Sequence, residues 1–495
     1  MASLEFPISQ VLFWFFIAYV LYNIAYAIYN IYFHPLAKVP GPKLRAAFYL
    51  PHYYELWTGD QVFNWRELHE KYGDIVRMSP RWVSVIKPEA WRDIYGHANK
   101  KPIPKDPDAY FIRNGVPANI LSSNDADHTR IRRLLNHAFS DGALRNQEHI
   151  INSYVSLFIE KLQKKAEGDI PVDIVRYLNF TTFDILGDLC FAEPFDALKN
   201  EAYNEWIAIN FRGFKAVRMF RVIRSTPILG MPLFFLLKLF PAIVKARQRA
   251  EMYTVQKTEK RMNTTTDRKD FVSYILKHND GKGMTRDEIM KTMGVLIIAG
   301  SETSATLLSG AVFYLLKNRR WLQKLQQELR ETFSDESEMT FASLSQLRVM
   351  QAVIMETFRM YPPVPTMLPR RTGDQGAMVA DSFIPPNVTV GIAQYAAYRS
   401  RTNFKDPDKF APQRFLDDEE YKNDNRSVVQ PFSVGPRNCI GQTMAWSEIR
   451  TILARLVWNF DMELQEESSN WEKHKVSILW DKPALMVRLK ARGDS

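Results

Sequence analysis

The chain has 495 residues, of which 46% are hydrophobic and 24% charged, a balance that is typical of an ordered globular protein and excludes a largely disordered one. Its two cysteines, Cys190 and Cys439, exclude a fold held by a disulfide framework, so we expect the body of the protein to face a reducing compartment. The net charge of +10 suits an anionic partner, but no basic run with interleaved aromatic residues predicts nucleic acid as that partner.

The first predicted element is an N-terminal membrane helix. The stretch from Val11 to Phe33 is uncharged and mostly apolar, and it exceeds the ~20 residues that span a bilayer. No Lys or Arg precedes it, so it lacks the basic start of a cleaved signal peptide; a buried core helix is the other alternative. Because Lys38, Lys43 and Arg45 follow the span, the positive-inside rule places the large C-terminal body in the cytosol.

The rest of the chain is expected to be mainly helical with small β-elements. Residues 74–95 alternate β-favouring side chains around Ser79 and Pro80 and predict a hairpin followed by a helix. From about Asp125 to Met360 apolar residues repeat at three and four positions, which indicates helices, and short strands return within 377–392 and 476–489. No repeat or flexible linker divides the chain, so the predicted architecture is mainly α with small β-sheets, in two parts: a membrane anchor (1–34) and one large domain (35–495).

A long helix is predicted from Thr285 to about Lys317. Thr285 and Glu288 form a capping-box pattern, and at 1.5 Å per residue the helix is ~45 Å long. Its sides are apolar nearly all round, so we expect it to cross the core.

The centre of this helix carries Gly300, Glu302 and Thr303, where large apolar side chains are expected. An interior glycine and a buried carboxylate both cost stability. Two explanations stand. Either Thr303 bonds back to an upstream carbonyl and Glu302 pairs with a distant basic residue, or a large group lies against the glycine and uses the polar pair.

The second cysteine lies in "PFSVGPRNCIGQ", residues 431–442, between Gly435 and Gly441. Glycines permit close approach of the backbone to a bulky flat partner, and the amides of a turn that enters a helix stabilise a thiolate. A buried structural cysteine is the ordinary alternative, but Cys190, at an apolar helix end, fits that role better. No histidine lies close in sequence and no C-x-x-C pair exists, so ligation of a haem iron by a single thiolate fits the turn better than nucleophilic catalysis.

This segment resembles the haem-binding loop of the cytochrome P450 superfamily, F-x-x-G-x-R-x-C-x-G-x-x-x-A. The resemblance covers essentially the whole chain and implies a cytochrome P450 fold that binds haem b (iron protoporphyrin IX) with Cys439 as the axial metal ligand. The matching residues are Phe432, Gly435, Arg437, Cys439, Gly441 and Ala445.

Two further motifs resemble structural and cofactor-binding segments of the family. "ETFR" is similar to its E-x-x-R helix, so Glu356 and Arg359 are expected to form a buried ion network with Arg414, although Gln413 stands where many members have Glu. "HTRIR" is similar to its W-x-x-x-R helix with a histidine in place of the tryptophan. The resemblance implies that the haem propionates receive hydrogen bonds from His128, Arg132 and Arg437. Arg370 is a further candidate, for which the adjacent Arg371 is an alternative.

"AGSETS" resembles the oxygen-activation segment of the family's central helix. By that resemblance Gly300 makes room for O2, Thr303 orients the water that delivers protons, and Glu302 is the acid of the relay.

The function that the resemblance implies is a haem-thiolate monooxygenase of the endoplasmic reticulum membrane that oxidises a lipophilic small molecule. The chain has no nicotinamide or flavin motif, so electrons are expected from an NADPH-cytochrome P450 reductase. Membrane lipid is the other expected partner, and the apolar segment 226–241 is expected either to dip into the bilayer surface or to form a buried helix pair. The chain looks most like fungal enzymes of secondary metabolism, such as the isotrichodermin hydroxylase group. A reductase-independent isomerase or dehydratase, and a non-catalytic membrane-anchored haem protein, remain alternatives.

Overall fold

The computed structural model describes residues 8–96, 102–110, 112, 118–213, 222, 241–279 and 283–492. The described helices are α1 (Ile8–Ile28), α2 (Lys43–Ala47), α3 (Leu50–Thr58), α4 (Gln61–Tyr72), α5 (Pro107–Tyr110), α6 (Asp125–Ala138), α7 (Asp141–Glu167), α8 (Ile174–Phe191), α9 (Ala197–Asn200), α12 (Pro241–Met262), α13 (Phe271–His278), α14 (Arg286–Lys317), α15 (Arg319–Thr332), α16 (Phe341–Leu344), α17 (Arg348–Met360), α18 (Gln394–Tyr398) and α19 (Gln442–Asn459). The strands are β1 (Ile75–Ser79), β2 (Trp82–Val85), β3 (Val172–Asp173), β4 (Arg370–Arg371), β5 (Ala377–Val379), β6 (Ser382–Ile384), β7 (Thr389–Ile392), β8 (Phe460–Leu464) and β9 (Met486–Ala491).

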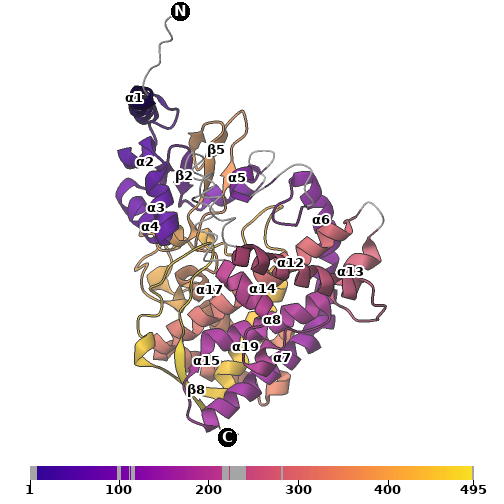
Figure 1. The fold of residues 1–495 in the computed structure, drawn as a ribbon. Helices are drawn as coiled ribbons and strands as arrows, with labels where there is room; N and C mark the ends of the chain where they lie inside the picture. Colours follow the sequence, from indigo (N-terminus) through magenta and orange to yellow (C-terminus); the bar gives the residue numbers. More distant parts are fainter. Residues whose placement is uncertain are drawn as a thin grey trace, which may run out of the picture.

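The N-terminal helix stands apart from the body of the molecule (Figure 1). It is apolar and long enough to cross a membrane over Ile8–Phe33, with mean hydropathy 1.9 and none of its most apolar window buried in the protein. Its last turn is the π-helical segment η1 (Tyr29–Phe33). The predicted N-terminal apolar helix is therefore confirmed, and it begins three residues before Val11.

Small sheets lie at the edges of the helical body, which confirms the mainly α fold. Strands β1 and β2 form the predicted hairpin, and β7 runs parallel to β2 and carries β4 on its far edge. The helix expected after this hairpin is a short π-helical turn, η2 (Trp91–Tyr95). The other two sheets of the described residues are β3-β9-β8 and β5-β6. The strand signal within 476–489 was only partly right, because regular pairing begins at Met486.

Helix α14 crosses the middle of the helical body, packed against α8, α12, α17 and α19 (Figure 1). Its predicted capping box is confirmed: the Glu288 backbone N–H donates to Thr285 Oγ1 at 3.2 Å, and the Thr285 N–H donates to the Glu288 carboxylate at 2.9 Å. A Cβ at Gly300 would lie 3.1 Å from the side chain of Leu186 on α8. Close packing of α14 on α8 therefore gives a reason for glycine at this position, independent of any ligand.

The predicted ion network is present beneath the segment that leads to Cys439. Glu356 and Arg359 are fully buried and form two hydrogen bonds of 2.7 Å, and Arg359 also donates to backbone carbonyls beyond α17. Arg414 lies 3.5 Å from Glu356 and pairs with Asp424, which sequence analysis did not identify. Asp424 supplies a second carboxylate to the network, where Gln413 itself supplies none.

Candidate active site

The loop before α19 presents Cys439 through a tightly held turn. The Cys439 N–H donates to the Phe432 carbonyl at 2.8 Å, and the Asn438 N–H donates to the Gly435 carbonyl at 3.0 Å. Gly435 has φ +76°, and a Cβ there would overlap the carbonyl oxygen of Tyr95. Glycine is thus required at 435 by both conformation and packing.

Gly441 differs from Gly435. It caps α19, and a Cβ there would meet only Phe139 among the described residues, at an ordinary 3.7 Å. Packing within the chain therefore does not demand glycine at 441, which agrees with space being left beside the thiol for another group.

Cys439 borders an interior space. Its side chain is exposed, yet burial raises the pKa of its thiol, while the Gly441 N–H and the Arg132 guanidinium oppose that rise. A thiol that is accessible but surrounded by protein lies on an internal hollow. Cys190, in contrast, is fully buried in α8, as expected for a structural cysteine.

Helix α14 offers two different polar residues at its centre. The Thr303 hydroxyl donates to the Ala299 carbonyl at 2.6 Å, and Glu302 is buried in an ion pair with Lys482. The structural explanation for Thr303 and Glu302, a bond back to an upstream carbonyl and a pair with a distant basic residue, is therefore present. They leave the Thr303 side chain half-exposed next to the exposed Ala299, so this face of α14 still borders open space.

Basic residues gather from four segments around the Cys439 loop. His128 and Arg132 lie one turn apart on α6, and the neutral form of His128 is favoured because burial, with Arg437, Lys105 and Arg132 nearby, lowers its pKa to about 3. Arg437 donates to the Ser123 carbonyl and to the exposed Asp125, and its other terminal nitrogen is buried with no partner among the described residues.

The structure distinguishes Arg370 from Arg371. Arg371 is neutralised by Asp106 and Asp108, with contacts of 2.8 and 2.7 Å. Arg370 is buried, donates only to the Ile103 carbonyl, and has an Nε without a hydrogen-bond partner in the described part of the chain. Arg370 is therefore the cation with free hydrogen-bonding capacity.

Lys105 joins this cluster and was missed by sequence analysis, because no motif surrounds it. It pairs with Arg370 in an isolated antiparallel bridge and donates to the Leu121 carbonyl at 2.7 Å. Burial, with Arg437 and Arg370 nearby, lowers its pKa to about 7. Asp125, which pairs with Arg437, is exposed, and Arg370 and Lys105 have no ion-pair partner among the described residues, so this cluster has an excess of positive charge.

The residues fit a haem with its thiolate ligand. Cys439 would supply a soft thiolate donor, and the unpartnered nitrogens of Arg370 and Arg437 would suit the two carboxylates of such a macrocycle. Phe432 packs edge-to-face on Phe358, with ring centres 5.4 Å apart, and so fixes the start of the loop.

Comparison with known proteins shows the family of this chain. The family model described as Cytochrome P450 matches residues 40–489. Cytochrome P450 monooxygenase astJ of Aspergillus oryzae is 40% identical over 470 residues, 94% of this chain and 93% of the relative. Cytochrome P450 monooxygenase astA of Talaromyces wortmannii is 41% identical over 477 residues, 96% of each chain. Trichothecene C-4 hydroxylase of Trichoderma arundinaceum is 40% identical over 476 residues, 93% of each chain. The chain belongs to the cytochrome P450 family, whose members are haem-thiolate monooxygenases.

Proposed function

We propose that this monooxygenase of fungal secondary metabolism hydroxylates or otherwise oxidises a lipophilic terpenoid, polyketide or alkaloid. The observation that carries the proposal is the position of Cys439, on an interior space beside a cluster of cations that lack a buried counter-charge. The face of α14 with Ala299 and Thr303 is flanked by the partly buried apolar residues Val295 and Ile298. An apolar wall of this kind favours an apolar substrate.

The bound cofactor in this proposal is haem b, held by Cys439 through its sulfur and by His128, Arg132, Arg370 and Arg437 at its propionates. When bound, it activates O2 for insertion into a C–H bond. The protein positions the cofactor and supplies protons. Phe432 and Gly441 shape the loop on the thiolate side, where Gly441 leaves room for the flat ring.

On the other side, Thr303 and Glu302 handle protons. Because the Thr303 hydroxyl donates to the Ala299 carbonyl, its lone pairs are left to accept from a water molecule and hold it in place. Glu302 supplies the proton that this water passes on. Gly300 lets α14 pack closely on Leu186 of α8, and in this proposal that packing sets the position of the helix beside the O2 site.

Electrons come from an NADPH-cytochrome P450 reductase, because the chain carries no nicotinamide or flavin motif. The net charge of +10 favours docking of a partner with an acidic face. The N-terminal helix anchors the protein in the endoplasmic reticulum membrane, and the basic residues after it keep the catalytic domain in the cytosol. The segment 226–241, proposed to touch the bilayer surface, lies outside the described residues except for the start of α12.

Reconstitution tests this function. The full-length enzyme, a fungal NADPH-cytochrome P450 reductase and a panel of apolar terpenoids, polyketides and alkaloids are incubated under ¹⁸O₂. The proposal predicts a product with one ¹⁸O atom that requires both NADPH and reductase. Turnover without NADPH would instead support an isomerase or dehydratase. Absence of both a substrate-induced spectral shift and NADPH oxidation would support a non-catalytic haem protein.

Replacing Lys105 with methionine is expected to weaken haem retention. We propose that Lys105 adds a charge-assisted hydrogen bond to a propionate, which contributes on the order of 2 kcal/mol, so haem should transfer to apomyoglobin on the order of thirtyfold faster. Propionate binding raises the pKa of Lys105 from about 7, so haem affinity of the wild-type protein should fall as pH rises above that value. Lys409, which is almost fully exposed, provides the matched Lys→Met control. Equal haem-transfer rates in both variants would remove Lys105 from the propionate site.

A further inference from the structure

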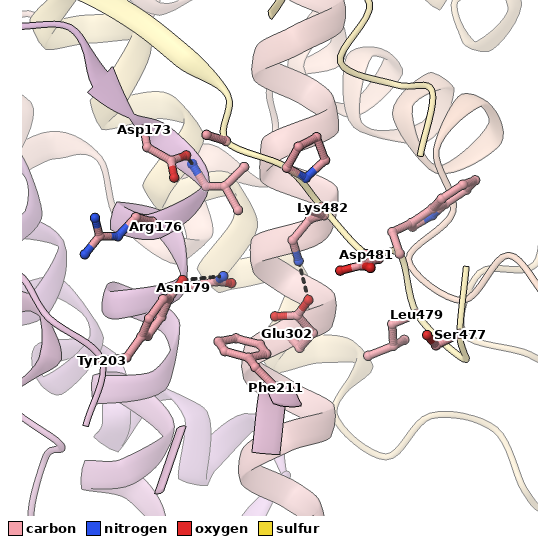
Figure 2. Close-up of a pocket in the computed structure, with 14 residues that line it drawn as sticks. Asp173, Arg176, Asn179, Tyr203, Phe211, Glu302, Ser477, Leu479, Asp481 and Lys482 are labelled. Atoms are coloured by element: carbon pink, nitrogen blue, oxygen red, sulfur yellow. Dashed lines mark hydrogen bonds and ion pairs between the residues drawn. The ribbon is translucent and has the colours of Figure 1, made fainter. Parts of the chain in front are cut away.

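Lys482 reaches from the C-terminal loop into the core of the protein and contacts the central helix at two points. Its Nζ donates to Glu302 Oε1 and, at 2.6 Å, to Thr306 Oγ1, and its side chain is 3% exposed. Glu302 and Thr306 lie one turn apart on α14, so a single ammonium group bridges both residues. Figure 2 shows Lys482 pointing from the loop toward Glu302.

This contact leaves the Glu302 carboxylate half-satisfied. Oε1 is held by Lys482, whereas Oε2 is buried and has no hydrogen-bond partner among the described residues. Burial raises the pKa of the Glu302 carboxyl, and the Lys482 ammonium opposes that rise. One oxygen is therefore fixed and the other is available to accept a proton.

A pocket of about 270 Å³ lies between α8, α14 and the C-terminal loop, and Glu302 forms part of its wall (Figure 2). The pocket has a mixed lining, in which polar groups such as Arg176 and the hydrogen-bonded pair Asn179 and Tyr203 stand beside apolar side chains. It is large enough to hold water, and its polar groups offer hydrogen-bond partners. Thr303, the next residue on the helix, projects about 100° away from Glu302 around the helix axis. Glu302 thus stands between this pocket and the face of α14 that carries Thr303.

We propose that Lys482 is a positioning residue for proton delivery, holding the Glu302 carboxylate so that its free oxygen takes protons from water in the pocket and returns them on the Thr303 side. This inference rests on the proposed function and adds two points: protons enter from the pocket, and Lys482 controls the carboxylate that takes them. In each cycle a hydronium ion that reaches the pocket from solvent gives its proton to Oε2 and remains as water, and the carboxyl then gives that proton to a water on the Thr303 side, which passes it on. Lys482 remains an ammonium throughout and neither gains nor loses a proton.

The test is a double-substitution cycle in the full-length holoenzyme with reductase. Because the ammonium acts through Glu302, Lys482→Met should lower kcat on the order of tenfold, leave KM unchanged and divert electrons from product to hydrogen peroxide. In a protein that already carries Glu302→Gln, adding Lys482→Met should cause no further loss of kcat. The double variant carries no unpaired buried charge, so it also guards against simple failure to fold.

Lys475→Met is the matched control, because Lys475 lies on the same loop but forms an exposed pair with Asp60. Its kcat and its yield of product per NADPH should equal those of the wild type. If Lys482→Met behaves like Lys475→Met, or if the losses from Lys482→Met and Glu302→Gln multiply, the inference is overturned.

An infrared measurement reports on the carboxyl independently of turnover. The carboxylic acid band of Glu302, assigned by its loss in Glu302→Gln, should persist to higher pH in Lys482→Met than in the wild type, because removal of the cation raises the pKa further. An unchanged midpoint would overturn the inference. If the wild-type enzyme forms no oxygenated product, the proposed function fails, while the infrared shift still tests whether Lys482 controls Glu302.

The titratable and charged groups that line the pocket or otherwise face Glu302 are Asp173, Arg176, Tyr203, Tyr361, Asp481 and Lys482.

Discussion

Replacing Cys439 with alanine is expected to abolish monooxygenase turnover. The loop before α19 exists in this conformation to present the sulfur: its turn is closed by the Phe432 carbonyl and requires glycine at 435. Without Cys439 a bound haem would lack the thiolate that the proposal assigns to it and the electron donation that such a ligand would supply. Product formation with reductase, together with haem content per protein, measures the effect.

Cys190→Ala is the matched control for this prediction, because Cys190 is the other of the two cysteines. It is fully buried in α8, and burial raises the pKa of its thiol well above the usual value. Its removal leaves a small cavity at a cost of about 1 kcal/mol and should not change turnover per haem. A Cys439→Ala enzyme that keeps wild-type turnover would contradict the proposed role of Cys439.

Replacing Arg359 with methionine should destabilise the fold by about 3–5 kcal/mol, a large part of the ~5–15 kcal/mol that holds a typical protein folded. The substitution leaves Glu356 charged, fully buried and without its closest partner. It also leaves the carbonyls of Tyr398 and Pro407 without their donor. Urea unfolding followed by circular dichroism gives the change in the free energy of unfolding.

Lys422→Met provides the comparison, since Lys422 and Glu419 form an ion pair with the same three-residue spacing but are exposed. That pair should contribute less than about 1 kcal/mol. If Arg359→Met and Lys422→Met unfold at the same urea concentration, the buried network does not hold the core as argued.

Local patterns predicted the elements whose signals lie close together in the sequence. The capping box at Thr285 and the apolar run after it predict α14, and the structure begins this helix at Arg286. The glycine-flanked cysteine predicts the turn at 431–442 for the same reason, since hydrogen bonds within a few residues shape that turn. Such signals depend on backbone conformation and short spacing, which a sequence displays directly.

Contacts between distant segments could not be predicted in this way. Lys482 lies 180 positions from Glu302, and Lys105 meets Arg370 across a still longer gap in the sequence. Neither lysine belongs to a motif, so only the packing of the folded chain brings them to the site. The strand expected within 476–489 shows the same limit. Before Met486 the described backbone forms only the isolated Val476–Trp480 bridge, and the Trp480 indole N–H donates to the Pro362 carbonyl while this loop delivers Lys482 to α14.

The reduced, CO-bound absorption spectrum of the purified full-length protein tests the central claim most directly. A thiolate ligand at Cys439 predicts a strongly red-shifted Soret band in the wild type that is absent from Cys439→Ala. An ordinary imidazole-type band that is the same in both proteins, or no bound haem in the wild type, would contradict Cys439 as the axial ligand and with it the proposed monooxygenase mechanism.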